Sequence, residues 1–178
     1  MVVMEAWQIL LIIIAIVLFV YLAALFVILT HAFDFGARIK RRLNSLNMIL
    51  FERRVIILKL YETCLKYGSQ FDDNAIEMIE TLKAYNFNKP KFEVCKSAIS
   101  LQKSIQNRIF YEFQARPEMK KDPAVENSIS MLDDLERNIR TSCSLFNADV
   151  QGYNYWIAVP GYHWIFFILG RKAFESIN

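Results

Sequence analysis

Residues 9–29 read ILLIIIAIVLFVYLAALFVIL and contain no charged residue, no proline and no glycine. A helix rises about 1.5 Å per residue and the hydrocarbon core of a bilayer is about 30 Å thick, so roughly 20 apolar residues suffice to cross it. A helix also satisfies its own backbone hydrogen bonds, which lipid cannot do. The sequence therefore predicts a transmembrane helix near the N-terminus.

Two other interpretations of this segment are weaker. A cleaved signal peptide has a basic start, an apolar core of about 7–15 residues and a site of small residues. Here Glu5 precedes the run without any Lys or Arg, and residues 30–33 (THAF) form a poor cleavage site. A buried core helix is rarely so long and so uniformly apolar. We therefore expect an exterior N-terminus and anchor over residues 1–33, and a soluble part over residues 34–178.

The basic residues indicate the orientation. No Lys or Arg precedes the apolar run. Four basic residues follow it closely: Arg38, Lys40, Arg41 and Arg42. The positive-inside rule then predicts the N-terminus outside and the rest of the chain in the cytoplasm. The same four side chains are candidate contacts for anionic lipid headgroups, and Arg53 and Arg54 extend the group along the chain.

Composition limits the remaining function classes. The net charge is only +3, which is too small to suggest nucleic-acid binding. Cys64, Cys95 and Cys143 are widely spaced and form no CxxC pair, so they are expected to be reduced and buried in a cytoplasmic domain. The two histidines, His31 and His163, offer no clustered ligand set for zinc. The sequence predicts no cofactor, no metal and no catalytic residue.

Apolar residues at helical spacing predict four helices after the anchor, separated by short breaks. Gly68 suits the end of the first helix, Asp72 suits the start of the second, and Asp122-Pro123 suits the start of the fourth. Pro90 marks the start of the third. Short connections favour antiparallel neighbours. The predicted fold class is all-α, with one transmembrane helix followed by an antiparallel four-helix bundle.

Aromatic residues crowd into the segment after this bundle. Three of them are candidate lipid contacts: Trp156, Trp164 and Phe167. Tyr and Trp favour the membrane–water interface, so this segment is open to two interpretations. It either closes the end of the helical core, which we favour, or makes a second contact with the membrane.

Asn147 and Asn154 lie seven residues apart, so they share one helix face beside apolar positions. A polar amide near a core needs hydrogen-bond partners. The favoured interpretation is that these candidate core-polar residues fix the register of the helix or cap the end of a neighbouring helix, and the alternative is a polar binding notch.

The C-terminal third contains a characteristic series of residues: Leu135-Glu136, Ile139, Phe146-Asn147, Val150, Tyr153-Asn154 and Pro160, followed by an apolar stretch, Gly170 and Phe174-Glu175. In this series the chain resembles the LemA family. Residues 115–120 are similar to the family's Ala-x-Pro-x-Leu-Lys linker. The family's Phe-Pro is Val159-Pro160 here, and the similarity is weak before residue 115. The chain is thereby identified as a divergent LemA-like protein.

The resemblance implies a membrane anchor followed by an antiparallel helical bundle, as in bacterial relatives, some of which are associated with membrane organelles of magnetic bacteria. It carries no catalytic residues. The leading hypothesis is a non-catalytic interaction or scaffold module at the cytoplasmic face of the cell membrane, which binds an unidentified protein partner. The alternative is a lipid-binding or membrane-shaping protein that uses the basic cluster and the aromatic tail. An enzyme is not expected, and homo-oligomerisation is left open because the apolar residues 55–58 fit either an intermolecular surface or the core.

Overall fold

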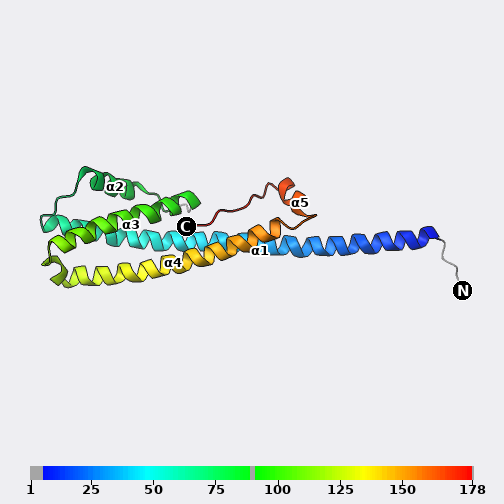
Figure 1. The fold of residues 1–178 in the computed structure, drawn as a ribbon, viewed down its shortest axis with the longest axis horizontal. Helices are drawn as coiled ribbons and strands as arrows, with labels where there is room; N and C mark the ends of the chain where they lie inside the picture. Colours follow the sequence, from blue (N-terminus) through cyan, green and yellow to red (C-terminus); the bar gives the residue numbers. More distant parts are fainter. Residues whose placement is uncertain (1–5, 89–90, 178) are drawn as a thin grey trace. The chain divides into compact units, whose positions relative to one another are not determined.

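The computed structural model describes residues 6–88 and 91–177, and every regular element within these ranges is helical (Figure 1). In chain order these are α1 (Ala6–Lys66), α2 (Asp73–Ala84), α3 (Phe92–Ala115), the 3-10 turn η1 (Met119–Lys121), α4 (Pro123–Ile157) and α5 (His163–Ile168). The predicted all-helical class is confirmed for these residues. Pro90, the predicted start of the third helix, lies outside the described residues.

α1 is a single helix of 61 residues, so the predicted anchor and the first helix after it are continuous. Residues 30–40 contain no proline, and one glycine, Gly36, is tolerated inside a helix. Arg38 lies one turn after Asp34 and pairs with it at 2.5 Å, which supports the helix at this point. In the part of the chain that the structure describes, α1 alone is long and apolar enough to cross a membrane, which makes it a candidate span by length and composition.

The chain divides into two compact units, and α1 and α4 contribute to both. The first unit combines Met1–Ile39 with Ala148–Ser176, and the second combines Lys40–Asn147 with Ile177–Asn178.

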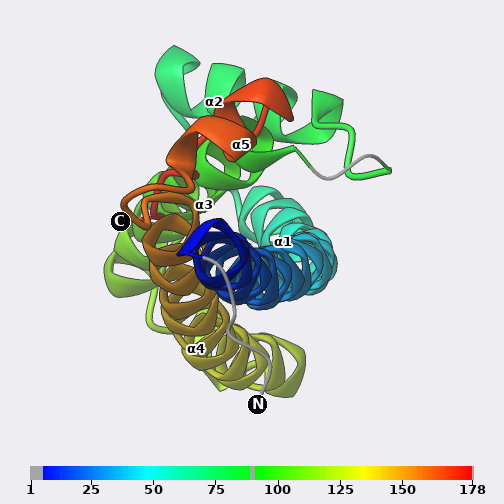
Figure 2. The ribbon, with the colours of Figure 1, turned by 90° about the vertical axis from the view of Figure 1, so that its right-hand side faces the viewer.

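In the second unit, α2 lies along α3, and α2 and α4 lie on opposite sides with α1 and α3 between them (Figures 1 and 2). The core of this unit is built from apolar residues of all four helices and of η1: Ile57, Leu60, Cys64, Ile79, Leu82, Ile105, Ile109, Phe113, Met119, Val125 and Leu132.

Local capping sets where these helices begin and end, as the sequence predicted. At the end of α1, the Ser69 N–H donates to the Cys64 carbonyl at 3.0 Å, and Gly68 has a φ of 75° that residues with a Cβ rarely adopt. At the start of α2, the Asp72 side chain accepts from the Ala75 N–H at 3.1 Å. At the start of α4, the Asp122 side chain accepts from the Ala124 N–H at 2.9 Å.

The first unit brings α4 close to α1. A Cβ on Gly152 of α4 would lie 2.5 Å from an edge carbon of the Phe35 ring on α1, so only glycine fits without a shift of that ring. A Cβ on Gly36 of α1 would lie 3.6 Å from the Tyr153 ring, which is ordinary van der Waals contact. The two helices therefore pack through one position that requires glycine and one that does not.

This difference gives a paired test. Gly36→Ala is expected to stabilise the protein by about 0.5–1 kcal/mol, because alanine favours the helix and meets no obstacle. Gly152→Ala is expected to destabilise it by about 1–2 kcal/mol, since the Phe35 ring must move. The free energy of unfolding of the full chain in detergent micelles, followed by circular dichroism, measures both. Equal shifts for the two variants would contradict the close approach at Gly152.

Candidate functional site

A charged residue occupies a core position of α1. The buried residues Leu46, Leu50, Ile57 and Leu60 recur at steps of three, four or seven, and the step of seven skips position 53. Arg53 lies at that position and only 1% of it is exposed. Its Nη2 donates to the Gln106 side-chain oxygen on α3 at 2.7 Å and pairs with the Glu136 carboxylate on α4 at 2.8 Å. One guanidinium thus links three helices of the second unit.

The burial of the Arg53 guanidinium affects its pKa. Burial lowers the pKa of Arg53, and the neighbouring Glu136 carboxylate acts in the opposite direction. A guanidinium remains protonated at any physiological pH, so the site holds a buried positive charge. The Arg53 Nε has no hydrogen-bond partner among the described residues. Arg53 was expected to extend the lipid-facing basic group, and this expectation is wrong because its charge lies in the core.

Two buried amides lie near Arg53 in the same unit and bond to backbone carbonyls. The Gln102 side chain on α3 donates to the Leu50 carbonyl at 2.8 Å, and the Asn47 side chain on α1 donates to the Phe87 carbonyl at 2.6 Å. The Gln102 side-chain oxygen has no partner among the described residues. These amides link α1 to α3 and to the segment after α2.

The thiols of the three cysteines have low reactivity in this environment. Burial raises the pKa of Cys64 and of Cys95 to about 11. Burial also raises the pKa of Cys143. Because the thiolate is the nucleophilic and metal-binding form, these thiols are protonated and weakly reactive at neutral pH.

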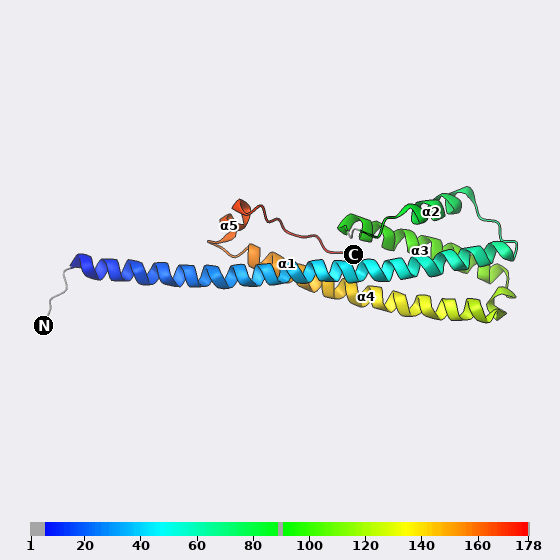
Figure 3. The same ribbon diagram turned by 180° about the vertical axis from the view of Figure 1, so that it is seen from behind.

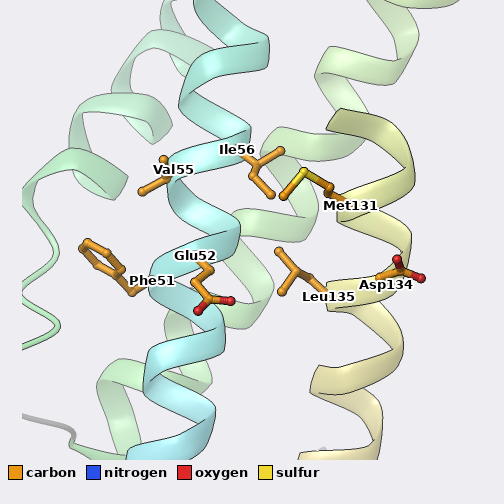
Figure 4. A pocket seen from close by; sticks show the side chains of 7 residues that line it. All are labelled: Phe51, Glu52, Val55, Ile56, Met131, Asp134 and Leu135. Carbon is orange, nitrogen blue, oxygen red and sulfur yellow. The ribbon is translucent and has the colours of Figure 1, made fainter. Parts of the chain in front are cut away.

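A shallow apolar groove lies on the second unit beside α1 and α4 (Figure 4). It encloses about 410 Å³ and is lined by five apolar residues and two carboxylates: Phe51, Val55, Ile56, Met131, Leu135, Glu52 and Asp134. Ile56 of α1 meets Met131 and Leu135 of α4 between the two helices (Figure 4). Val55 and Met131 are each about half exposed, at 51% and 49%. The apolar residues 55–58 thus divide between this groove and the core, where Ile57 is fully buried.

The predicted lipid-facing basic residues are all at the surface. Arg38, Lys40, Arg41 and Arg42 have exposed side chains. Arg38 pairs with Asp34, and the hydrogen bond that Arg38 donates to the Asp34 carboxylate raises the pKa of Arg38. The cluster is therefore accessible for headgroup contact, which stays a prediction.

The three aromatic candidates differ in exposure. Trp156 is partly buried and stacks on the His31 ring with the centroids 4.7 Å apart. Trp164 and Phe167 of α5 are exposed, Phe167 by 84%. Only Phe166 of α5 is buried. The outward side chains of α5 thus do not fill a core within the residues that the structure describes.

Asn147 and Asn154 make the same contact, each within its own unit. The Asn147 side chain donates to the Ile177 carbonyl at 2.7 Å and accepts from the Ile177 N–H at 2.8 Å. The Asn154 side chain donates to the Phe174 carbonyl at 2.9 Å and accepts from the Phe174 N–H at 3.0 Å. Each amide thereby pairs with an extended C-terminal residue as a neighbouring strand would. The polar positions that the sequence indicated hold the chain's own C-terminal segment.

Across residues 6–88 and 91–177, no group of three or more His, Cys, Asp or Glu side chains is placed to hold a metal ion. The carboxylates of α4 are instead paired, with Arg137 against Asp134 at 3.0 Å and Arg140 against Glu136 at 3.3 Å. These two ion pairs join residues three and four positions apart on the surface of one helix.

The fold and its surfaces define an all-helical protein with one candidate membrane span and an apolar groove. Comparison with protein-family models, with curated proteins and with solved structures finds no match.

The buried ion pair gives a stability test. Glu136→Ala leaves the Arg53 charge buried without its counter-charge, and we expect the free energy of unfolding to fall by about 3–5 kcal/mol. The matched control is Asp134→Ala on the same helix, which removes the exposed pair with Arg137 and should cost less than about 1 kcal/mol. Chemical denaturation of the full chain in detergent measures both. Similar losses in the two variants would show that Arg53 does not depend on Glu136.

Proposed function

We propose that this protein is a LemA-like, membrane-anchored interaction module without catalytic activity. In this proposal α1 crosses the cell membrane with its N-terminus outside, and the second unit is an antiparallel four-helix bundle in the cytoplasm that binds a protein partner. The positive charges at residues 38–42, together with the absence of Lys and Arg before the apolar run, support this orientation. The continuity of α1 supports a direct mechanical link between anchor and bundle.

The observation that carries the proposal is the apolar groove of Figure 4. Val55 and Met131 expose half of their surface there, although the buried residues Ile57 and Leu132 lie within two residues of them on the same helices. Burying such surface against a partner is favourable by about 25 cal/mol per Å². A groove between two helices also matches the way that an amphipathic helix binds, with one apolar face laid along the groove.

The charges of the groove indicate the chemistry of the partner. Its two charged lining residues are both acidic, Glu52 on α1 and Asp134 on α4. The Glu52 carboxylate lies among the apolar side chains of the groove, and Asp134, which also pairs with Arg137, lies on its α4 side (Figure 4). Such a lining complements a helix whose apolar face is flanked by Lys or Arg. The occupant we propose is therefore a basic amphipathic helix of a partner protein.

A model peptide tests this proposal. The full chain in nanodiscs of zwitterionic lipid should bind a labelled leucine–lysine amphipathic peptide about tenfold tighter than a leucine–glutamate peptide of the same pattern, which corresponds to about 1.4 kcal/mol. Fluorescence anisotropy of the peptide measures the affinity.

Two substitutions locate the binding. Val55→Arg places a positive charge in the groove and should weaken binding of the lysine peptide, whereas Ile76→Arg at an exposed position of α2 should not. Equal affinity for the two peptides, or equal effects of the two substitutions, would overturn the assignment of the groove.

A second candidate function is lipid binding through the basic cluster and the aromatic C-terminal segment. The outward apolar side chains of α5 favour it, since Phe167 and Ile168 are 84% and 72% exposed. This function is compatible with the first, because none of the residues it uses lines the groove.

A further inference from the structure

After α4 the chain turns back along the apolar part of α1. The Tyr162 ring stacks on the Tyr21 ring with the centroids 4.7 Å apart. The Tyr21 hydroxyl donates to the Gly161 carbonyl at 3.3 Å, and the Tyr162 hydroxyl donates to the Tyr21 carbonyl at 3.4 Å. Tyr21 lies eight residues before Leu29, the end of the apolar run, which is about 12 Å at helix rise. The turn before α5 thus reaches well inside the candidate span.

α5 then runs beside α1 (Figures 1 and 3). Phe166 packs against Ile28 and Ala32, and the three form one buried apolar cluster. Of the other apolar side chains of α5, Ile165 is partly buried, whereas Trp164, Phe167 and Ile168 are exposed, Phe167 and Ile168 the most. α5 therefore packs on α1 through Phe166 and exposes these three apolar side chains.

We infer that the turn at residues 158–162 and α5 are embedded in one leaflet of the bilayer that α1 crosses, with lipid acyl chains covering Trp164, Phe167 and Ile168. The inference rests on the proposed crossing of the membrane by α1. At the level of Tyr21 and Ile28, a crossing helix is surrounded by hydrocarbon, so a segment held against those residues has the same surroundings. Hydrocarbon is a favourable environment for the exposed apolar side chains of α5, whereas exposing them to water is unfavourable.

Part of the backbone of this turn is hydrogen-bonded, which lowers the cost of placing it in hydrocarbon. Unpaired polar groups cost several kcal/mol each in hydrocarbon, and irregular backbone persists there only when its groups are satisfied. The Gly161 carbonyl accepts from both the Tyr21 hydroxyl and the Trp164 indole N–H, the latter at 2.9 Å. The Val159 carbonyl accepts from the Tyr162 N–H at 3.2 Å, and Pro160 has no N–H to satisfy.

The two ends of this segment lie against α1 residues just beyond the apolar run. On one side, Trp156 stacks on His31. On the other side, the Arg171 guanidinium lies 5.1 Å from the centre of the Phe33 ring. His31 and Phe33 lie just beyond Leu29, where headgroups are expected. Trp and Arg are residues typical of that interface, since their apolar parts lie in lipid and their polar ends in water.

Depth-dependent quenching of tryptophan fluorescence tests the inference on the full chain in lipid vesicles. The substitutions Trp7→Phe and Trp156→Phe leave Trp164 as the single tryptophan. Phosphatidylcholine brominated on its acyl chains should remove most of the Trp164 fluorescence. Adding Phe167→Trp in the same background places a second probe on α5, at its most exposed position, and this signal should be quenched as strongly.

Two controls separate the possible failures. In a chain whose only tryptophan is Trp7, brominated lipid should also quench, because Trp7 lies at the start of the candidate span. In a chain whose only tryptophan comes from Tyr111→Trp, on the exposed surface of α3, it should not.

Quenching of Trp7 without quenching of Trp164 would overturn the embedding of α5 and leave the membrane anchor intact. Quenching of neither would reject the anchor and the inference together. If a second copy of the chain covers α5 instead of lipid, Trp164 will be shielded from brominated lipid while a Phe167→Cys variant forms disulfide-linked dimers, and that result also overturns the inference.

Discussion

The constraint on which the rest of this protein depends is the exposure of apolar side chains along the first half of α1. In that half of the helix, residues such as Phe19 and Phe26 expose about 70% of their surface. No neighbouring segment in the described chain covers most of this stretch. Exposure of so many apolar side chains to water would be strongly unfavourable. In the proposed function a bilayer covers these side chains, and the basic residues that follow predict which side of it holds the folded units.

The second unit meets a different constraint, which is the burial of the Arg53 charge. Its partners come from α3 and α4, so the three helices must keep a fixed register for the ion pair to form. A buried ion pair adds little net stability but penalises other arrangements that leave the charge unpaired. This gives α1, α3 and α4 a defined alignment, which in turn keeps the groove residues Ile56 and Met131 opposite each other.

Much of the fold follows from local signals that the sequence contains. Gly68, Asp72 and Pro123 set the helix ends because their effects act within one turn. The burial of Arg53 was not predicted, because a charged residue is normally expected at the surface. The seven-residue step between Leu50 and Ile57 nevertheless indicates that position 53 lies on the core face of α1. The continuity of α1 was missed because the change from apolar to basic sequence resembles a boundary. The position of α5 depends on contacts between Tyr162 and Tyr21, which lie 141 residues apart and leave no local pattern.

The most direct test of the account is a topology measurement on the full chain with a reporter fused after Asn178. The account predicts that a fluorescent protein matures and stays in the membrane fraction after a carbonate wash, while an alkaline phosphatase at the same position is inactive. Fluorescence released by the wash would contradict the membrane anchor. Active phosphatase without fluorescence would contradict the orientation and place the groove and the buried Arg53 on the outer side of the membrane.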